Sequence, residues 1–396
     1  MSGAAEGSIL VLNVGSSTLK FGVFSLVAGD EPLLRGVVEY AGPNSGQVRI
    51  TDSAGRSHSR QLNVDRESAP AQLIHHLEQH YSLASIQAVG HRLVHGGSRL
   101  VTPVRIDASV RAMLEDVIPL APDHLPTELR AIDEVSRLSS SLVQIACFDT
   151  AFHSAMPSVA RIFGLPRLLS NSGVVRYGFH GLSYEYVTSE LRRLGELPRR
   201  TVVAHLGNGA SLVALRDGAS IDTSMGMTPA GGIAMSTRSG DLDPGIILYL
   251  LRSRNFSISD LDDAVNRDGG LQGISELSSD VRELLTARST DTRAAEAIDV
   301  FCYQAKKCIG SFAAVLGGLD ALVFSGGIGE HSPEVRAQIC EELEFLGVAI
   351  DPALNDANAP FISAEQGAVQ IRIVNTREEV MIARHVRTVL ANNHIP

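Results

Sequence analysis

The sequence predicts an α/β protein made of two related domains, and three observations carry that prediction. The chain has 396 residues, which suits two domains of about 200 residues better than one compact core. Apolar strands alternate with helical stretches in both halves, the pattern expected of mixed sheets flanked by helices. A strand–turn–strand segment near the start, residues 8–24, returns in the second half as residues 201–214.

The two strand–turn–strand segments correspond residue by residue. Superposing Gly15 on Gly207 places Asn13 over His205, and both turns are small and polar between apolar strands. A turn of this kind leaves several backbone N–H groups free to face an anion. We therefore expect a duplicated architecture whose halves grip one polyphosphate from both sides.

The charge balance and the cysteines exclude several classes of protein. The formal net charge is −10, with 44 acidic residues against 34 Lys plus Arg, which argues against non-specific binding to nucleic acid or to an anionic membrane. Any phosphate ligand must then be held by local basic residues. The four cysteines show no C-x-x-C spacing, so buried thiols in a reducing compartment are expected. The first residues lack a basic leader, and no apolar run reaches membrane-spanning length. We expect a soluble, cytoplasmic protein.

The predicted elements follow the chain in order. In the first half the pattern indicates strands at 8–14, 20–27, 33–40, 47–51, 86–90 and 142–148, and helices at 66–81, 107–118 and 127–138. In the second half it indicates a hairpin at 201–215, a strand at 321–324, and helices at 181–194, 243–254, 258–267, 276–287, 292–316 and 378–391. A domain boundary is expected near residue 150, where the second α/β pattern begins.

Four turns rich in glycine and serine each follow an apolar strand, at 13–18, 205–211, 223–232 and 325–331. A single turn of this kind is weak support for phosphate binding, because tight turns need glycine for backbone reasons alone. Four together favour a nucleotide site. The chain has no G-x-x-x-x-G-K-[ST] loop, and no G-x-G-x-x-G opens a helix after the first strand. Walker-type binding is thereby excluded, and a dinucleotide dehydrogenase is disfavoured.

Four polar residues stand where strands or glycine turns meet loops. Arg92 and Arg238 lie among small residues at such junctions, where sites are commonly built, and a planar guanidinium there suits bidentate capture of carboxylate or phosphate. His180, near two glycines, is either a site residue or a core histidine. Asp149, at a strand end, is either a site acid or a helix cap.

The motifs taken together resemble those of the acetate kinases. The segments that carry the resemblance are 13–20, 90–97, 148–153, 176–181, 205–209, 222–226, 237–241, 326–330 and 378–379. The resemblance implies the actin-like ATPase fold of the acetate and sugar kinase, heat-shock chaperone and actin superfamily: two duplicated domains with ribonuclease H-like mixed sheets, and a cleft between them. It implies an N-terminal domain at 1–150, on which a C-terminal helix at about 380–396 packs back. It implies a nucleotide-binding, dimerising domain at 151–380, and a homodimer.

The resemblance also implies roles for individual residues. Asn13 and Glu378 would position Mg²⁺, which Mn²⁺ could replace, while His180, Arg238 and Asp149 would be catalytic. Arg92 would hold the acyl substrate, beside an apolar pocket of Val94, Phe179 and Pro229. ATP or ADP would contact a larger set: Ser16, Thr18, Lys20, His205, Leu206, Gly207, Asn208, Gly209, Asp280, Val281, Arg282, Gly327, Ile328, Gly329, Glu330 and His331.

The chain departs from the family pattern at several positions. Asp123, in Leu120–Pro126, replaces a leucine that helps to line the acyl pocket in the family, and an unpaired carboxylate is costly to bury. Either Asp123 turns away, or the pocket accepts a substrate with a polar or cationic tail. Tyr184 stands where histidine is common, and His331 and Arg377 replace asparagine.

The expected activity is reversible phosphorylation of acetate by ATP, through direct in-line transfer. The alternatives are a kinase for propionate or another small functionalised carboxylate, and a non-catalytic ATP-binding regulator of the same fold. Retention of four residues together speaks against the regulator: Arg92, Asp149, His180 and Arg238. Because a carboxylate substrate has a pKa of roughly 4, it needs no base at pH 7. Asp149 is therefore expected to orient the water shell of Mg²⁺ or to hold Arg92.

Overall fold

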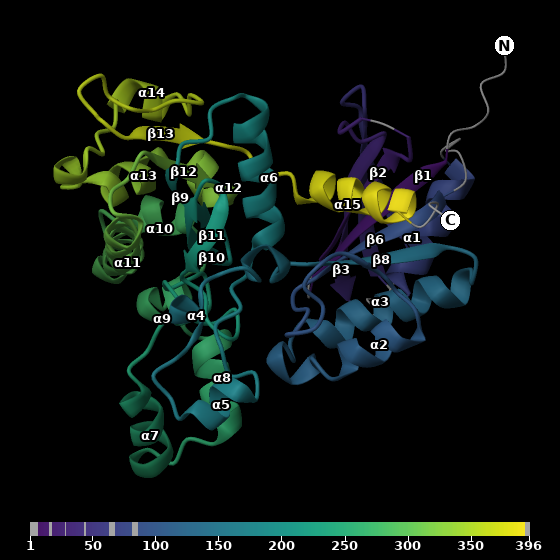
Figure 1. Ribbon diagram of the computed structural model, residues 1–396, viewed down its shortest axis with the longest axis horizontal. Coiled ribbons are helices and arrows are strands. Elements are labelled where there is room, and N and C mark those ends of the chain that lie inside the picture. Colours follow the sequence, from purple (N-terminus) through teal and green to yellow (C-terminus); the bar gives the residue numbers. More distant parts are fainter. Residues whose placement is uncertain are drawn as a thin grey trace. The chain divides into compact units, whose positions relative to one another are not determined.

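A computed structural model describes residues 7–15, 18–27, 29–42, 45–62, 68–80 and 86–392. It divides into two compact units, each with its own sheet (Figure 1). Unit 1 comprises Met1–Ala151 with Arg377–Pro396, and unit 2 comprises Phe152–Thr376. The chain thus leaves unit 1 near residue 151 and returns to it with the last helix. None of the helices within these described ranges is both long and apolar enough to cross a bilayer.

Unit 1 contains an eight-stranded mixed sheet in the order β5-β4-β3-β2-β1-β6-β8-β7. Strands β1 to β5 form an antiparallel run, whereas β1, β6 and β8 are parallel neighbours. Their bounds are β1 Ser8–Val14, β2 Thr18–Ser25, β3 Leu34–Gly42, β4 Ser45–Asp52, β5 Ser57–Leu62, β6 Ile86–Leu93, β7 Val104–Arg105 and β8 Val143–Phe148. Strand β1 is buried along nearly its whole length, as expected of an apolar strand in the middle of a covered sheet.

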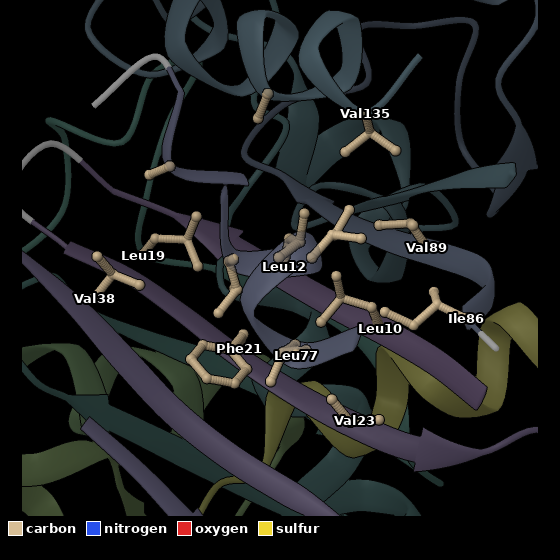
Figure 2. Packing of buried hydrophobic residues seen from close by; sticks show 14 of the residues in the cluster. Leu10, Leu12, Leu19, Phe21, Val23, Val38, Leu77, Ile86, Val89 and Val135 are labelled. Carbon is tan, nitrogen blue, oxygen red and sulfur yellow. The ribbon is translucent and has the colours of Figure 1, made fainter. Parts of the chain in front are cut away.

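Helices cover this sheet and enclose the core of unit 1. They are α1 Ala69–His80, α2 Ala108–Glu115, α3 Leu125–Leu138 and α15 Glu378–Asn392, with a 3₁₀ turn at Ile118–Leu120. Figure 2 shows Leu10, Phe21, Leu77 and Val135 within one apolar cluster, to which β1, β2, α1 and α3 contribute. Such burial supplies most of the stabilisation of a domain of this size.

Helix α15 packs against β1 and β6, although more than 280 residues separate it from them in the sequence (Figure 1). Gly90 on β6 permits this approach. A Cβ at Gly90 would lie 2.5 Å from Cγ2 of Ile382 and 2.8 Å from Cγ2 of Val386. The close fit of helix on strand fixes the first residue of α15, Glu378, on unit 1.

Unit 2 contains a five-stranded sheet in the order β11-β10-β9-β12-β13. The bounds are β9 Arg200–Leu206, β10 Ala210–Arg216, β11 Ala219–Thr223, β12 Ala321–Ser325 and β13 Gln370–Ile373. An antiparallel hairpin, β9–β10, precedes two parallel additions, β12 and β13. The same sequence of pairings, β3-β2-β1-β6-β8, forms the middle of the sheet in unit 1. This repetition of topology is the duplication that the paired turns predicted.

The helices of unit 2 are α4 Ser158–Arg161, α5 Arg167–Asn171, α6 Gly181–Arg193, α7 Pro244–Ser253, α8 Ile258–Asn266, α9 Gly270–Ser275, α10 Val281–Ala287, α11 Thr292–Leu316, α12 Gly326–His331, α13 Pro333–Cys340 and α14 Pro352–Asp356, with 3₁₀ turns at Ala151–His153 and Glu344–Leu346. The longest, α11, packs on β9 and β10. It begins at Asp291, whose side chain accepts from two backbone N–H groups, and ends at Gly317, which has φ 75°.

Some predicted elements differ from the structure. The helix predicted at 276–287 begins only at Val281, because Glu276 has a positive φ of 51° that ends α9 and the Asp280 side chain caps α10. The glycine turn predicted at 325–331 is instead mostly helix α12, whose first residue, Gly326, has φ 74°. Strand β5 was not predicted, because its sequence, Ser57 to Leu62, is almost entirely polar.

Candidate active site

Three polar residues of unit 1 lie at the carboxyl ends of adjacent parallel strands. Register pairs Leu12 with His91 and Leu93 with Phe148, so Asn13, Arg92 and Asp149 follow one another across β1, β6 and β8. Ligand sites in α/β sheets form at this edge, because loops diverge there and leave space above the strand ends.

The Arg92 guanidinium joins these residues into one cluster. Its Nε donates to Asp149 Oδ1 at 3.1 Å, and its Nη2 donates to the other carboxylate oxygen of Asp149. Its Nη1 donates to Asn13 Oδ1 at 3.2 Å. The carboxylate of Glu378, at the start of α15, lies 3.7 Å from Nε. Three residues widely separated in sequence therefore meet at the Arg92 guanidinium.

Burial governs the electrostatics of this cluster. The Asp149 side chain is 1% exposed. Burial raises the pKa of Asp149 to about 6, with a further rise from Glu378, while Arg92 opposes the shift. Burial acts to lower the pKa of Arg92, but the carboxylates of Asp149 and Glu378 outweigh it and raise that pKa. At pH 7 and above Asp149 and Arg92 therefore form an ion pair between an ionised carboxylate and a guanidinium, with bidentate geometry.

The donor atoms beside Arg92 fit a hard divalent cation. Asn13 offers an amide oxygen and Glu378 a carboxylate oxygen, both within contact of Arg92. Mg²⁺ prefers oxygen ligands and commonly uses one or two protein groups, with water and substrate phosphates completing its shell. Over the described parts of the chain, no group of three or more His, Cys, Asp or Glu side chains is placed to enclose a metal ion.

Glu128 is a buried acid near Arg92 that the sequence analysis did not identify as a site residue. Glu128, in the first turn of α3, is 2% exposed, and its Oε2 accepts from the backbone N–H of Val94 at 3.1 Å. Burial raises the pKa of Glu128 to about 8, and Asp149 adds to the rise, whereas Arg92 and the Val94 N–H oppose it. The only signal in the sequence was an acid in the first turn of a helix, which usually indicates no more than helix-end electrostatics.

Glu128→Gln should therefore stabilise the protein increasingly as pH rises. The folded state keeps the Glu128 proton until about pH 8, whereas the unfolded chain loses it near the usual value of 4.5. Between these two pH values the folded state binds more protons than the unfolded chain. The free energy of unfolding of the wild type therefore falls, relative to that of the variant, by up to about 1.4 kcal/mol per pH unit. The measurement is the difference in Tm between Glu128→Gln and wild type from pH 5 to 9, which should widen and level off above pH 8.

A matched control for this measurement is Glu115→Gln, which changes an acid whose side chain is 61% exposed. Its Tm difference from wild type should stay flat from pH 6 to 9. A difference for Glu128→Gln that is equally flat would contradict a raised pKa at Glu128.

The other predicted residues of unit 1 are distributed around the cluster. Lys20 is exposed and pairs across the hairpin with Asn13. Thr18 is half-buried, and Ser16 lies outside the described residues. Val94 is buried, and Asp123 is exposed. Because the Asp123 carboxylate is exposed, it does not incur the free-energy cost of burying an unpaired charge.

In unit 2, His180 and Arg238 face one point above the turn after β9. A Cβ at Gly209 would lie 3.2 Å from His180 Nε2 and 3.5 Å from Arg238 Nη1. The glycine therefore leaves open the space that both donors approach. Arg238 is oriented by its own Nη1, which donates to the carbonyl of Pro229 at 3.2 Å.

The neighbours of His180 fix its position. The residue has φ 59° at the start of α6, and its ring lies 4.6 Å from that of His205, centroid to centroid. Phe179, which precedes it, is buried, and its carbonyl accepts from His153 Nε2 at 3.0 Å. The histidine and the predicted pocket residue Phe179 are both held by buried contacts.

The predicted nucleotide residues fall into two groups. Residues 205–209 form the end of β9 and the turn after it, and residues 327–331 lie in helix α12, which follows β12. The two strands are parallel neighbours with Ser325 opposite His205. The two segments touch, since a Cβ at Gly326 would lie 2.6 Å from the carbonyl oxygen of Leu206. The second group, Asp280, Val281 and Arg282, begins α10, where the Asp280 side chain accepts from the N–H and guanidinium of Arg282.

Glu330, on helix α12, makes structural contacts at both ends of that region. Its Oε1 accepts from the N–H of Gly326 at 3.0 Å, and from the N–H and hydroxyl of Thr376 at 3.0 and 3.1 Å. The carboxylate thus connects the start of α12 to the last residue of unit 2. His331, beside it, is exposed.

The chain is similar to known proteins over almost its full length. A model of the Acetokinase family matches residues 8–384. An acetate kinase of Rhodopseudomonas palustris is 43% identical over 393 residues, covering 96% of this chain and 97% of that one. The crystal structure of Porphyromonas gingivalis acetate kinase covers 97% of this chain and 100% of its own, with 35% identity and a TM-score of 0.87. That of a propionate kinase from Francisella tularensis covers 96% and 98%, with 35% identity and a TM-score of 0.89.

These similarities agree with the geometry of the two units. The duplicated mixed sheets are those of the actin-like ATPase fold, as in the acetate and propionate kinase structures. The match runs from β1 to α15 and includes every residue of the Arg92 cluster. On this combination of fold, site and sequence, the chain belongs to the acetokinase family.

Proposed function

We propose that the protein transfers the γ-phosphoryl group of ATP to acetate, forming acetyl phosphate and ADP, and that it catalyses the reverse reaction. The observation that carries this proposal is the Arg92 cluster at the strand ends of unit 1, in which a carboxylate-binding guanidinium is held by Asp149 on one side and Asn13 on another. Similarity to acetate kinases over 96% of the chain supports it.

The substrate carboxylate would act as the nucleophile without a base. With a pKa of roughly 4 it is ionised at pH 7, so one of its oxygens can form the new P–O bond while the bond from phosphorus to the ADP oxygen breaks. Arg92 would hold the carboxylate in line for this displacement. Asp149 would hold Arg92, through the two hydrogen bonds described above.

His180 and Arg238 would stabilise the phosphoryl group during transfer. Their Nε2 and Nη1 atoms approach the same open space above Gly209. Donors fixed in advance on the equatorial oxygens commonly contribute a hundredfold or more to the rate, because charge spreads over those oxygens in the transition state.

Nucleotide and metal would occupy the groups of residues already described. We assign the phosphates of ATP to the turn after β9, which includes Gly207 and Gly209, and to the start of helix α12 after β12, which includes Gly327. Asn13 and Glu378 would hold Mg²⁺, which when bound neutralises charge on the transferring phosphates. The two domains implied by the sequence, 1–150 with the last helix and 151–380, would then be the acyl and nucleotide lobes of the enzyme.

The test of this activity is hydroxylamine trapping. Purified protein with ATP, Mg²⁺ and acetate should accumulate acetyl hydroxamate in step with ADP release. ADP release without hydroxamate would indicate an ATPase, and absence of both would indicate a nucleotide-binding regulator. Either result would overturn the proposal.

A second candidate is phosphorylation of propionate. The propionate kinase of Francisella tularensis matches this chain with a TM-score of 0.89, and the family resemblance implies that Asp123 stands where a leucine of the acyl pocket is usual. A panel of acetate, propionate, butyrate and 3-aminopropionate, compared by kcat/KM, distinguishes the candidates. The highest value for propionate or for the amino acid would replace acetate as the substrate.

We also propose that the protein is a homodimer in which α7 lies at the interface. No residue of α7 is buried, although its sequence is almost entirely apolar. Ile246, Leu248, Tyr249 and Leu251 are each between 39% and 50% exposed. An apolar helix surface of this kind is normally covered by a partner. We further propose that the enzyme is cytoplasmic, which fits the use of ATP and four cysteines that form no disulfide with one another.

Leu248→Glu should convert the dimer into a monomer. A carboxylate at the centre of a closely packed apolar interface would be buried without a partner, which opposes association. Light scattering after size exclusion should give twice the 42.2 kDa chain mass for wild type and the single mass for the variant. Phe345→Glu, at a residue 79% exposed outside α7, is the control and should remain dimeric. A monomeric wild type would contradict the proposal.

A further inference from the structure

Three side chains of unit 2 form a hydrogen-bonded line that ends at His180. Ser211, on β10, lies 2.9 Å from His180 Nδ1 through its Oγ. The hydroxyl of Tyr184, one turn further along α6, lies 2.5 Å from the same oxygen. Tyr184 and Ser211 are both fully buried. The line therefore runs from the interior of unit 2 to the imidazole.

The direction of the hydrogen bonds follows from the protons available. Burial raises the pKa of Tyr184, so its phenol remains protonated. Its proton needs an acceptor, and Ser211 Oγ is in position to be one. Because Ser211 Oγ then accepts from the phenol, its own proton is available to His180 Nδ1. The reverse direction would leave the buried phenolic proton directed away from that acceptor, which is unfavourable.

The consequence concerns the other ring nitrogen of His180. When Nδ1 of a neutral imidazole accepts a hydrogen bond, the ring proton is on Nε2. Nε2 is the atom that faces the space above Gly209, beside Arg238 Nη1. A proton on Nε2 makes the histidine a donor at that space, as stabilisation of a phosphoryl oxygen requires.

We propose that Tyr184 and Ser211 are positioning residues that fix His180 in its Nε2–H tautomer, with Tyr184 as the terminal donor. This inference rests on the proposed function, in which His180 donates to the transferring phosphoryl group, and it adds the source of the histidine's tautomer. Tyr184 is also a position at which the chain departs from its family, so the terminal donor here is a phenol.

The experiment that tests the proposal combines tautomer spectroscopy with kinetics. In protein labelled with ¹⁵N-histidine, the ¹⁵N shifts and two-bond couplings of His180 should report the Nε2–H form, with His180→Gln used to assign the signal. In Tyr184→Phe the Ser211 hydroxyl can point either way, so a mixture of tautomers should appear. The kcat should fall about tenfold, which corresponds to about 1.4 kcal/mol, while KM for ATP and for the carboxylate stays within about twofold.

Tyr186→Phe is the matched control, since it removes a hydroxyl from a buried tyrosine on the same helix. It should leave the His180 signal and kcat as in wild type. An Nδ1–H tautomer in the wild type would overturn the proposal, and so would a Tyr184→Phe spectrum identical to that of wild type. The spectrum needs no substrate. An inactive chain that has the Nε2–H form would therefore refute the proposed function alone, and an active chain without it would refute this inference alone.

Discussion

Asp149→Asn is expected to lower kcat by about a hundredfold or more, with the fold intact. The carboxylate is buried and forms two hydrogen bonds to Arg92. The amide of asparagine supplies one acceptor and no charge, so Arg92 loses half of its bidentate support and turns toward Glu378, 3.7 Å away. Loss of one fixed hydrogen-bonding group at a reacting centre commonly lowers kcat by about a hundredfold or more. Steady-state kinetics should also show a larger rise in KM for the carboxylate than for ATP.

A double-mutant cycle identifies the route of the Asp149 effect. If Asp149 acts by holding Arg92, the double variant Arg92→Ala/Asp149→Asn should have the same kcat as Arg92→Ala alone. In Arg92→Ala the guanidinium is already absent, so Asp149 has nothing left to support. Additive losses would mean that Asp149 acts elsewhere, for example on the water shell of Mg²⁺. Asp133→Asn is the control, since Asp133 pairs bidentately with Arg111 at 41% exposure and should change kcat little.

The sequence alone singled out Arg92 and Asp149 because both stand at the ends of apolar runs, and Asn13 was added through the family resemblance. Such runs align their carboxyl ends when they form parallel strands, which is why the three residues lie side by side. Glu378 could be placed beside them only through the family resemblance, since nothing local to α15 indicates that it returns to β1 and β6. The Gly90 contact with Ile382 that permits this return depends on tertiary packing.

The buried contacts that the sequence did not reveal lack any pattern of their own. Glu128 is unusual only because α3 buries it near Arg92. Tyr184 was visible in the sequence only as a departure from the family, and its contact with Ser211 exists because α6 and β10 bring the two together. Helix 276–287 was wrong for a related reason: Glu276 and Asp280 interrupt it through local backbone and capping contacts that periodicity does not report. Buried polar partners of site residues are a property of the fold.

Arg336→Met is expected to produce the largest loss of stability among these predictions, and to weaken nucleotide binding with it. Arg336 is fully buried on α13. Its guanidinium donates to Asn355 Oδ1 and to the carbonyl oxygens of Gly329 and Asn355, at 2.8 to 2.9 Å, and to Asn358 Oδ1 at 2.8 Å. Methionine would fill much of the volume but leave these buried acceptors without their donor, at about 1–3 kcal/mol for each acceptor that water cannot reach.

A loss of about 3 kcal/mol corresponds to a fall in Tm of about 6–12 °C for a unit of this size. Because Gly329 belongs to helix α12, whose start is assigned to the nucleotide, the Tm of the variant should also rise less than that of wild type on addition of ADP with Mg²⁺. Arg336→Lys keeps the positive charge but not the planar guanidinium with its several donors. Its Tm should therefore lie between those of wild type and Arg336→Met. The control is Arg288→Met, which breaks a partly exposed pair with Asp299 and should shift Tm by about 2 °C or less. If folded Arg336→Met shows the same ADP-induced rise in Tm as wild type, then Arg336 on α13 does not support nucleotide binding and contributes to stability alone.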